Sequence, residues 1–217
     1  MFLAVAGCQT TTPPPLIPPF TPLPTPKPTP PPTPPKPLPP KAPKTTGKLE
    51  VPRLKEWRYI VIHHSGTDSG SAKKFDQFHR NVKHWDSLGY HFVIGNGHGS
   101  RDGEIEVGPR WVAQQHGAHT ATSGNAYNNY GIGICMVGNF DAKAPTPAQM
   151  QAITDLVAYL QDRCKISNRN IKLHRDCKDT RCPGRKFTKE MLLARLPNRA
   201  SEPSFWSRDS LLLNWLK

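Results

Sequence analysis

The segment between residues 13 and 43 holds eighteen of the chain's 25 prolines, alternating with threonine, lysine and leucine. Proline has no amide hydrogen and a fixed backbone dihedral, so this segment is unsuited to a helix or a central strand. It favours extended polyproline II, and its 31 residues would reach roughly 100 Å at about 3.1 Å per residue. We therefore expect a disordered linker over residues 9–50 and one compact domain over residues 51–197.

The amino terminus places Ala-Gly directly before Cys8, after a short apolar run. This pattern resembles the lipobox of bacterial lipoproteins, in which the signal peptide is removed and the cysteine is lipidated. We expect residues 1–8 to be such a signal and Cys8 to anchor the protein in a membrane of the cell envelope, facing the periplasm or wall. The linker would then be a spacer. Because the apolar run is short and no basic residue precedes it, an accidental motif in a cytoplasmic protein is the alternative.

The formal net charge of +13 at pH 7 is strongly positive. Such a surface attracts polyanions, among them nucleic acid, anionic lipid and cell-wall polymers. No basic run is interleaved with aromatic residues as in a nucleic-acid-binding module. We therefore expect no nucleic-acid partner.

Hydrophobic patterning divides the domain into alternating strands and helices. Apolar and β-branched runs predict strands at Tyr59–Ile62, Tyr90–Ile94, Glu104–Val107, Ile132–Val137 and Ile171–Leu173. Apolar residues at three- and four-residue spacing predict three helices. The first covers Ala72–Lys83, the second begins after a cap at Thr146, and the third covers Phe187–Leu196. This order predicts an α/β fold with a mixed central sheet and helices on both faces.

Two of these strands end in histidine. His63 and His64 follow the first strand, His174 follows the last, and Cys182 comes soon after. Two imidazoles and a thiolate give zinc three protein ligands and leave one position open for water, which suits amide hydrolysis. His64 or Cys177 could instead close the site into a structural one. However, neighbouring strand residues point to opposite faces, so His64 cannot easily reach the metal that His63 binds.

The region from about Trp57 to Phe187 resembles the zinc-dependent N-acetylmuramoyl-L-alanine amidases, the family of phage T7 lysozyme and the peptidoglycan recognition proteins. The resemblance is carried by five landmarks in the family's order: Val61–Ser65, Gly89–Phe92, Gly117–Thr120, Ile132–Phe140, and His174 with Cys182–Gly184. It implies a peptidoglycan (muropeptide) substrate and Zn²⁺ held by His63, His174 and Cys182. It also implies that Tyr90 and Thr180 flank the metal and that His64 and His119 lie in the substrate groove.

The side chains of Tyr90, Thr180 and Trp111 can each have more than one role. The hydroxyl of Tyr90 can donate to an oxyanion or hold the attacking water, although a core tyrosine is the alternative. Thr180 can form a hydrogen bond but brings no charge. Trp111 can stack on a sugar ring of the substrate, and a core tryptophan fits equally well.

The predicted function is a zinc hydrolase that cleaves the amide between N-acetylmuramic acid and L-alanine. The alternatives are a non-catalytic peptidoglycan-binding module and a zinc endopeptidase acting on the stem peptide. All three metal ligands are present, which favours a hydrolase over a binding module. We expect a monomer.

Features outside the predicted metal site leave two questions open. Cys164 and Cys177 can pair as a disulfide in an oxidising compartment or remain separate thiols, and Cys135 reads as a buried free thiol. The apolar tail over residues 198–217 can pack on the domain or dock to wall or membrane.

Overall fold

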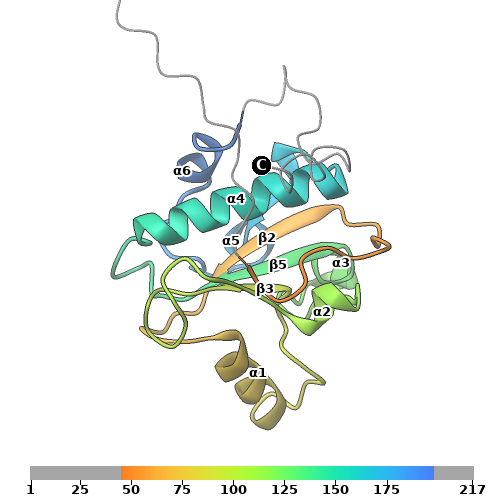
Figure 1. Cartoon of the computed structure of the whole chain (residues 1–217), viewed down its shortest axis with the longest axis horizontal. Helices are drawn as coiled ribbons and strands as arrows, with labels where there is room; N and C mark the ends of the chain where they lie inside the picture. Colours follow the sequence, from red (N-terminus) through yellow and green to blue (C-terminus); the bar gives the residue numbers. More distant parts are fainter. Residues whose placement is uncertain (1–44, 198–217) are drawn as a thin grey trace, which may run out of the picture. The chain divides into compact units, whose positions relative to one another are not determined.

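The computed structural model describes residues 45–197 (Figure 1). The predicted signal with Cys8, the proline-rich segment and the tail over residues 198–217 lie outside the described residues. The sheet order is β1-β4-β3-β5-β2-β6, and every neighbouring pair is parallel except β3 with β4. The strands are β1 (Thr45–Thr46), β2 (Tyr59–His64), β3 (Phe92–Ile94), β4 (Ile105–Val107), β5 (Gly131–Met136) and β6 (Ile171–Leu173). The predicted mixed sheet is confirmed.

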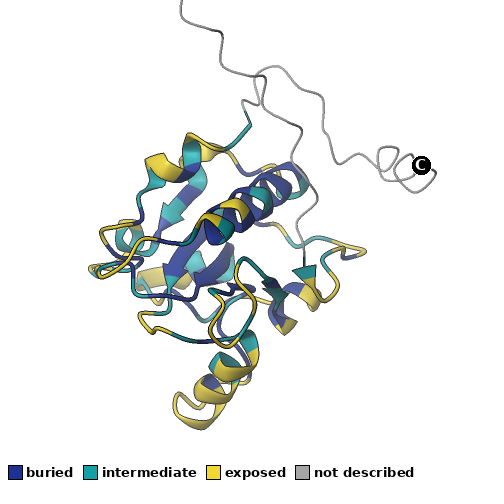
Figure 2. Ribbon diagram, turned by 60° about the vertical axis from the view of Figure 1, so that its left-hand side comes forward, coloured by how far each residue is buried: buried dark blue, intermediate teal, exposed yellow. Residues whose placement is uncertain are grey.

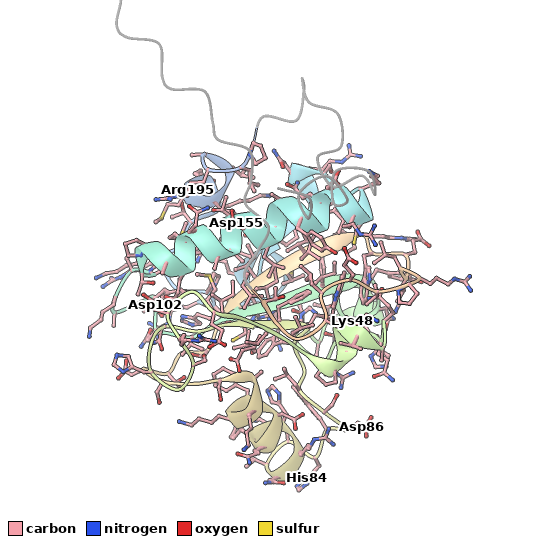
Figure 3. The ribbon with its side chains drawn as sticks, in the orientation of Figure 1. Lys48, His84, Asp86, Asp102, Asp155 and Arg195 are labelled. Atoms are coloured by element: carbon pink, nitrogen blue, oxygen red, sulfur yellow. The ribbon has the colours of Figure 1, made fainter. Side chains whose placement is uncertain are left out.

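Helices lie on both sides of this sheet, as predicted. They are α1 (Ala72–Asn81), α2 (Pro109–Val112), α3 (Ala126–Asn129), α4 (Pro147–Cys164), α5 (His174–Cys177) and α6 (Lys189–Leu193), with 3₁₀ turns η1 (Ser123–Asn125) and η2 (Asn168–Asn170). Figure 1 shows α4 and α6 over one face and α1 beyond the other. Charged side chains such as Asp86 and Arg195 lie at the periphery of the domain (Figure 3). Within residues 45–197, no helix combines the length and apolar character needed to span a membrane.

Helix α4 covers the larger hydrophobic core. Its N-terminus has a capping box, because Thr146 Oγ1 accepts from the Gln149 amide at 3.0 Å and the Gln149 side chain accepts from the Thr146 amide at 3.2 Å. Pro147 occupies the first turn, where its missing amide hydrogen costs nothing. The predicted apolar stripe is buried in full: Met150, Ile153, Leu156, Val157 and Leu160. Figure 2 shows the buried side of α4 turned towards the strands.

The two central strands carry different residues on their two faces. Ile60 and Ile62 of β2 pack in the α4 core together with Ile132, Ile134 and Met136 of β5. On the opposite face, Val61 pairs with Gly133 and His63 pairs with Cys135. Small residues at alternate positions of β5 therefore leave space above the sheet beside His63. That space is where the candidate site lies.

The domain begins earlier than predicted. Thr45 pairs with Ile105 in the parallel β1–β4 ladder, and the Leu49 carbonyl accepts from the Trp111 indole at 2.8 Å. The predicted linker boundary at residue 50 is therefore corrected: residues 45–50 belong to the domain. The strand β1 has only two residues, both threonine, so it carries no apolar pattern along the chain that would predict a strand.

Three predicted elements are shorter in the structure by two residues or more. The strand expected from Tyr90 begins at Phe92, and the last helix covers only Lys189–Leu193 after a Thr188 cap. The helix expected to reach Lys83 ends at Asn81. In that helix Phe78 is 46% exposed, because α1 rests on the domain along one narrow edge on which only His79 is buried.

The four cysteines among the described residues are free thiols. Cys135 is buried as predicted, and Cys164 and Cys177 are not joined by a disulfide.

Candidate metal centre

Two neighbouring parallel strands bring the two ligand histidines together. Ile62 of β2 is paired with Leu173 of β6, and each strand leads directly into a histidine. Carboxyl ends of parallel strands meet at one edge of a sheet, which is where α/β proteins place ligands. The ring centroids of His63 and His174 are 4.4 Å apart.

The third donor comes from the loop that follows α5. Cys182 Sγ lies 3.9 Å from Nδ1 of His63. One donor atom from each of His63, His174 and Cys182 lies within 4.8 Å of the other two. The predicted ligand set is thus gathered at one point, and neither His64 nor Cys177 belongs to the group.

The surroundings of these donors fit a bound cation. Nε2 of His174 is buried without a hydrogen-bond partner, and it is the only side-chain nitrogen or oxygen of this kind among residues 45–197. Buried polar atoms almost always have a hydrogen-bond partner. A buried nitrogen without one, on one of three clustered donors, therefore indicates that a ligand binds there. Two imidazoles and one thiolate are donors that zinc prefers.

Burial keeps both histidines in the form that binds metal. It lowers the pKa of His63 well below its usual value, with His119 and His174 adding to the shift, and it lowers the pKa of His174 to about 4. Both rings are therefore neutral near pH 7. Burial raises the pKa of the Cys182 thiol to about 11, although the hydrogen bond of 3.3 Å from the His64 amide acts in the opposite direction and lowers this pKa. A cation bound here would displace the thiol proton.

The ring of His63 is held from behind by a second histidine. Nε2 of His63 lies 3.1 Å from Nδ1 of His119 and 3.3 Å from Oγ1 of Thr120. The sequence predicted His119 as a substrate-groove residue. The structure instead buries it at 8% exposure against the ligand His63, where it has little surface to offer a substrate.

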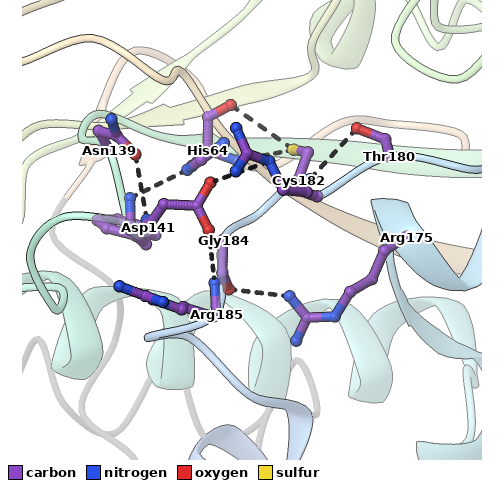
Figure 4. Close-up of polar contacts among 10 residues, drawn as sticks. His64, Asn139, Asp141, Arg175, Thr180, Cys182, Gly184 and Arg185 are labelled. Carbon is purple, nitrogen blue, oxygen red and sulfur yellow. Dashed lines mark hydrogen bonds and ion pairs between the residues drawn. The ribbon is translucent and has the colours of Figure 1, made fainter.

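The loop that carries Cys182 is fixed by Arg175 of α5. The Arg175 amide donates to the Cys182 carbonyl at 2.9 Å, and its guanidinium donates to the carbonyls of Gly184 at 2.8 Å and Phe187 at 2.9 Å. Gly184 has a φ of +96° and packs so closely on the backbone of Phe140 that a Cβ atom would overlap it. Figure 4 shows this loop with its hydrogen bonds to Asp141 and Arg175.

Replacing Arg175 with lysine is expected to loosen this loop. Lysine keeps the charge but cannot donate to two carbonyls in a fork, and hydrogen bonds from charged groups contribute about 1.5–3 kcal/mol. We expect the free energy of unfolding to fall by about that amount in urea titrations.

Arg181→Lys is the matched control for this change. Its side chain is 90% exposed and lies 3.8 Å from Asp141, a surface pair worth about 0–1 kcal/mol. Equal stability of the two variants would show that Arg175 does not fix the loop.

Both predicted catalytic side chains lie beside the three donors. The ring of Tyr90 is 5.3 Å from that of His63, and burial raises the pKa of its hydroxyl well above the usual value, with the thiols of Cys135 and Cys182 adding to the shift. Oγ1 of Thr180 accepts from the Cys182 amide at 3.2 Å. Tyr90 precedes β3 and is partly exposed, and it also packs against the smaller core cluster that includes Cys135.

The other two predicted substrate residues differ in their surroundings. His64 is half-buried, and its Nδ1 accepts from the Phe140 amide at 3.1 Å, which leaves Nε2 as the protonated nitrogen of the neutral ring. Trp111 is 1% exposed and packs against Phe92 and Trp57. Its assignment to sugar stacking was wrong, because no face of the indole is open to a substrate.

Sequence reasoning missed the supporting residues of this site. Arg175, Thr120 and the contact between His119 and His63 were not predicted, because each depends on loops meeting in space. One local pattern could have helped: Gly131, Gly133 and Cys135 alternate along one face of β5. Small residues at alternate strand positions indicate that something large packs above them.

The family model described as N-acetylmuramoyl-L-alanine amidase matches residues 53–185. Peptidoglycan-recognition protein SA of Drosophila melanogaster is 38% identical over 114 residues, which cover 49% of this chain and 51% of that protein. The endolysin of Klebsiella phage KP32 is 31% identical over 144 residues, which cover 63% of this chain and 86% of the endolysin.

A solved structure agrees with these sequence matches. The N-acetylmuramoyl-L-alanine amidase LysC from Clostridium intestinale superposes with a TM-score of 0.56 at 29% identity, over 70% of this chain and 95% of LysC. The chain spans about half the length of the fly protein and 24% of a mouse N-acetylmuramoyl-L-alanine amidase. Because the matched region covers most of the chain and all three clustered donors, this chain belongs to the N-acetylmuramoyl-L-alanine amidase family.

Proposed function

We propose that this protein is a zinc-dependent hydrolase that cleaves the amide between N-acetylmuramic acid and L-alanine in peptidoglycan. The observation that carries the proposal is the convergence of His63, His174 and Cys182, with donor atoms within 4.8 Å of one another. A binding module needs no such cluster. Membership of the amidase family supports peptidoglycan as the substrate.

His63, His174 and Cys182 would hold the ion. Zinc bound there would supply a Lewis acid that lowers the pKa of water and polarises the scissile carbonyl. The chain itself contributes neutral imidazoles, whose lone pairs are free near pH 7 because burial lowers their pKa values. It also keeps His64 off the ion, because Nδ1 of that ring is held by the Phe140 amide.

Tyr90 is proposed to stabilise the oxyanion that forms at the scissile carbonyl. Its raised pKa keeps the phenol protonated, so the hydroxyl can donate a hydrogen bond at neutral pH. The contact between the rings of Tyr90 and His63, whose centroids are 5.3 Å apart, supports this role. A preorganised donor of this type acts most strongly where water is excluded.

Thr180 and His64 are proposed to orient the substrate. Thr180 Oγ1 already accepts from the Cys182 amide, so its own hydrogen remains available for donation. The protonated Nε2 of His64 can donate in the same way. Neither group is charged in this state, so substrate contacts here would depend on hydrogen-bond geometry.

Digestion of purified sacculi tests the proposal. We expect mass spectrometry to find free stem peptides that begin with L-alanine, and about one zinc per chain by metal analysis. Treatment with a chelator should abolish these products, and added zinc should restore them. A binding module would sediment with sacculi and release nothing. An endopeptidase would release fragments with a different new amino terminus, and either result would overturn the proposed function.

A further inference from the structure

We propose that His119 is a positioning residue: together with Thr120 it fixes the ring of His63 in the orientation and tautomer that present Nδ1 to the metal. The inference rests on the proposed zinc site. It assigns His119 a role behind the metal ligand in place of a role in the substrate groove. Four hydrogen bonds around the rings of His63 and His119, and the close packing of two glycines against His119, support this role.

The direction of the hydrogen bonds follows from one carbonyl. Nε2 of His119 lies 3.3 Å from the Gly131 carbonyl oxygen, which can only accept, so Nε2 carries the proton of the neutral ring. Nδ1 of His119 is therefore an acceptor. It lies 3.1 Å from Nε2 of His63, which must then be the protonated nitrogen of that ring. The lone pair of His63 is left on Nδ1, on the side of Cys182.

Thr120 completes the arrangement without changing these directions. Its Oγ1 lies 2.9 Å from Nδ1 of His119, to which the hydroxyl can donate. The same oxygen lies 3.3 Å from Nε2 of His63 and can accept from it. The single Nε2 proton of His63 is thus shared between two acceptors, and turning the ring away from them would lose both.

The backbone on which the two residues sit is itself held. The amides of His119 and Thr120 both donate to Oδ1 of Asn128 at 2.8 Å. Asn128 is 6% exposed, and its amide nitrogen donates to Asn125 Oδ1 at 2.8 Å. A single buried side chain therefore fixes the height of both residues above the sheet.

The cavity around His119 is shaped by glycine. A Cβ atom added at Gly133 of β5, or at Gly117 before the histidine, would overlap the imidazole of His119. The ring thus lies directly on the strand that neighbours β2. Glycine at these two positions therefore lets the ring of His119 lie close to the backbone of β5 and within hydrogen-bond distance of His63.

Metal affinity measures this role directly. Removing the hydrogen-bond partner of a ligand histidine typically weakens metal binding by about 10- to 100-fold. His119→Gln places its amide near the Nε2 position and loses the acceptor at Nδ1. His119→Asn places an oxygen near the Nδ1 position and can still accept from His63. We expect zinc binding, measured by competition with a chromophoric chelator, to weaken about 10- to 100-fold in the first variant and less than about threefold in the second.

Two further variants separate positioning from folding. His91 is another fully buried histidine, bonded to the Gly133 amide at 2.9 Å and the Gln115 carbonyl at 3.0 Å, with no hydrogen bond to a ligand residue. His91→Gln should lower the free energy of unfolding and leave zinc affinity unchanged. Thr120→Val should weaken zinc binding while Thr120→Ser preserves it, which tests the same point if His119 variants fail to fold. Visible spectra of the cobalt(II)-loaded variants should show a changed ligand field only where His63 has lost its partner.

The outcomes distinguish this inference from the proposed function. A parent protein that binds no zinc would refute the zinc site on which both depend. A parent that binds zinc, with His119→Gln and Thr120→Val binding equally tightly, would overturn only the positioning role. Equal weakening in His119→Gln and His91→Gln would also overturn it, because the effect would then come from the fold.

Discussion

Replacing Cys182 with serine is expected to lower amide hydrolysis by at least about 10³-fold and to remove zinc from the purified protein. A serine hydroxyl is a poor ligand for zinc, and two imidazoles alone hold it weakly. Loss of the Lewis acid removes several kcal/mol of transition-state stabilisation, at about 1.4 kcal/mol for each factor of ten. Product release from sacculi and zinc per chain are the two measurements.

Cys177→Ser is the matched control for this variant. Cys177 lies three residues after His174 and is also partly buried, but its thiol donates to the Leu173 carbonyl at 3.6 Å and is not one of the three clustered donors. We expect this control to keep its zinc and its activity. A Cys182→Ser protein that retains both would show that the cluster of His63, His174 and Cys182 is not the active centre.

Replacing Tyr90 with phenylalanine is expected to lower kcat by about 10²- to 10³-fold, the effect of removing one oxyanion donor. The aromatic ring remains, so its contacts with His63 and His119 should persist. Zinc content and KM should therefore change little. Steady-state rates on a soluble muropeptide, together with metal analysis, check this split between kcat and KM.

The competing role for the Tyr90 hydroxyl is its hydrogen bond with the buried thiol of Cys135. If that bond were its only function, Tyr90→Phe would lower the free energy of unfolding by about 1 kcal/mol and leave kcat unchanged. Tyr127→Phe serves as the control, because Tyr127 packs against Tyr59 and its hydroxyl interacts with Cys177, which is not one of the three clustered donors. A drop in kcat of the same size in both variants would remove Tyr90 from the catalytic residues.

The strongest hydrophobic patterns predicted their elements well. The helix opened by Thr146 and Pro147, and the strand beginning at Tyr59, stand where the sequence placed them. Both bury long apolar stripes, so their local pattern and their tertiary environment agree. The two-residue strand β1 and the four-residue helix α2 are too short to show a periodic apolar pattern, and neither was predicted.

The residues of the candidate site also fall into those that the sequence predicted and those that it did not. The three donors could be named because the sequence resembles a known family at those positions and because imidazole and thiolate groups suit zinc. Trp111 was assigned to the substrate site in error, since residue type alone cannot distinguish a stacking tryptophan from a buried one. His119 matched the family landmark, but its place behind His63 depends on β5 lying next to β2 with glycine at position 133.

The order of residues along the chain is sufficient to predict which side chains could bind a metal, which segments carry the core, and the class of the fold. These properties depend on residue chemistry and on periodicity along a strand or helix. The folded arrangement is needed to show which nitrogen of His63 faces the thiol, what holds the Cys182 loop, and which aromatic residues remain accessible. Such features arise from contacts between residues far apart in the chain, and their distances and directions are set by packing.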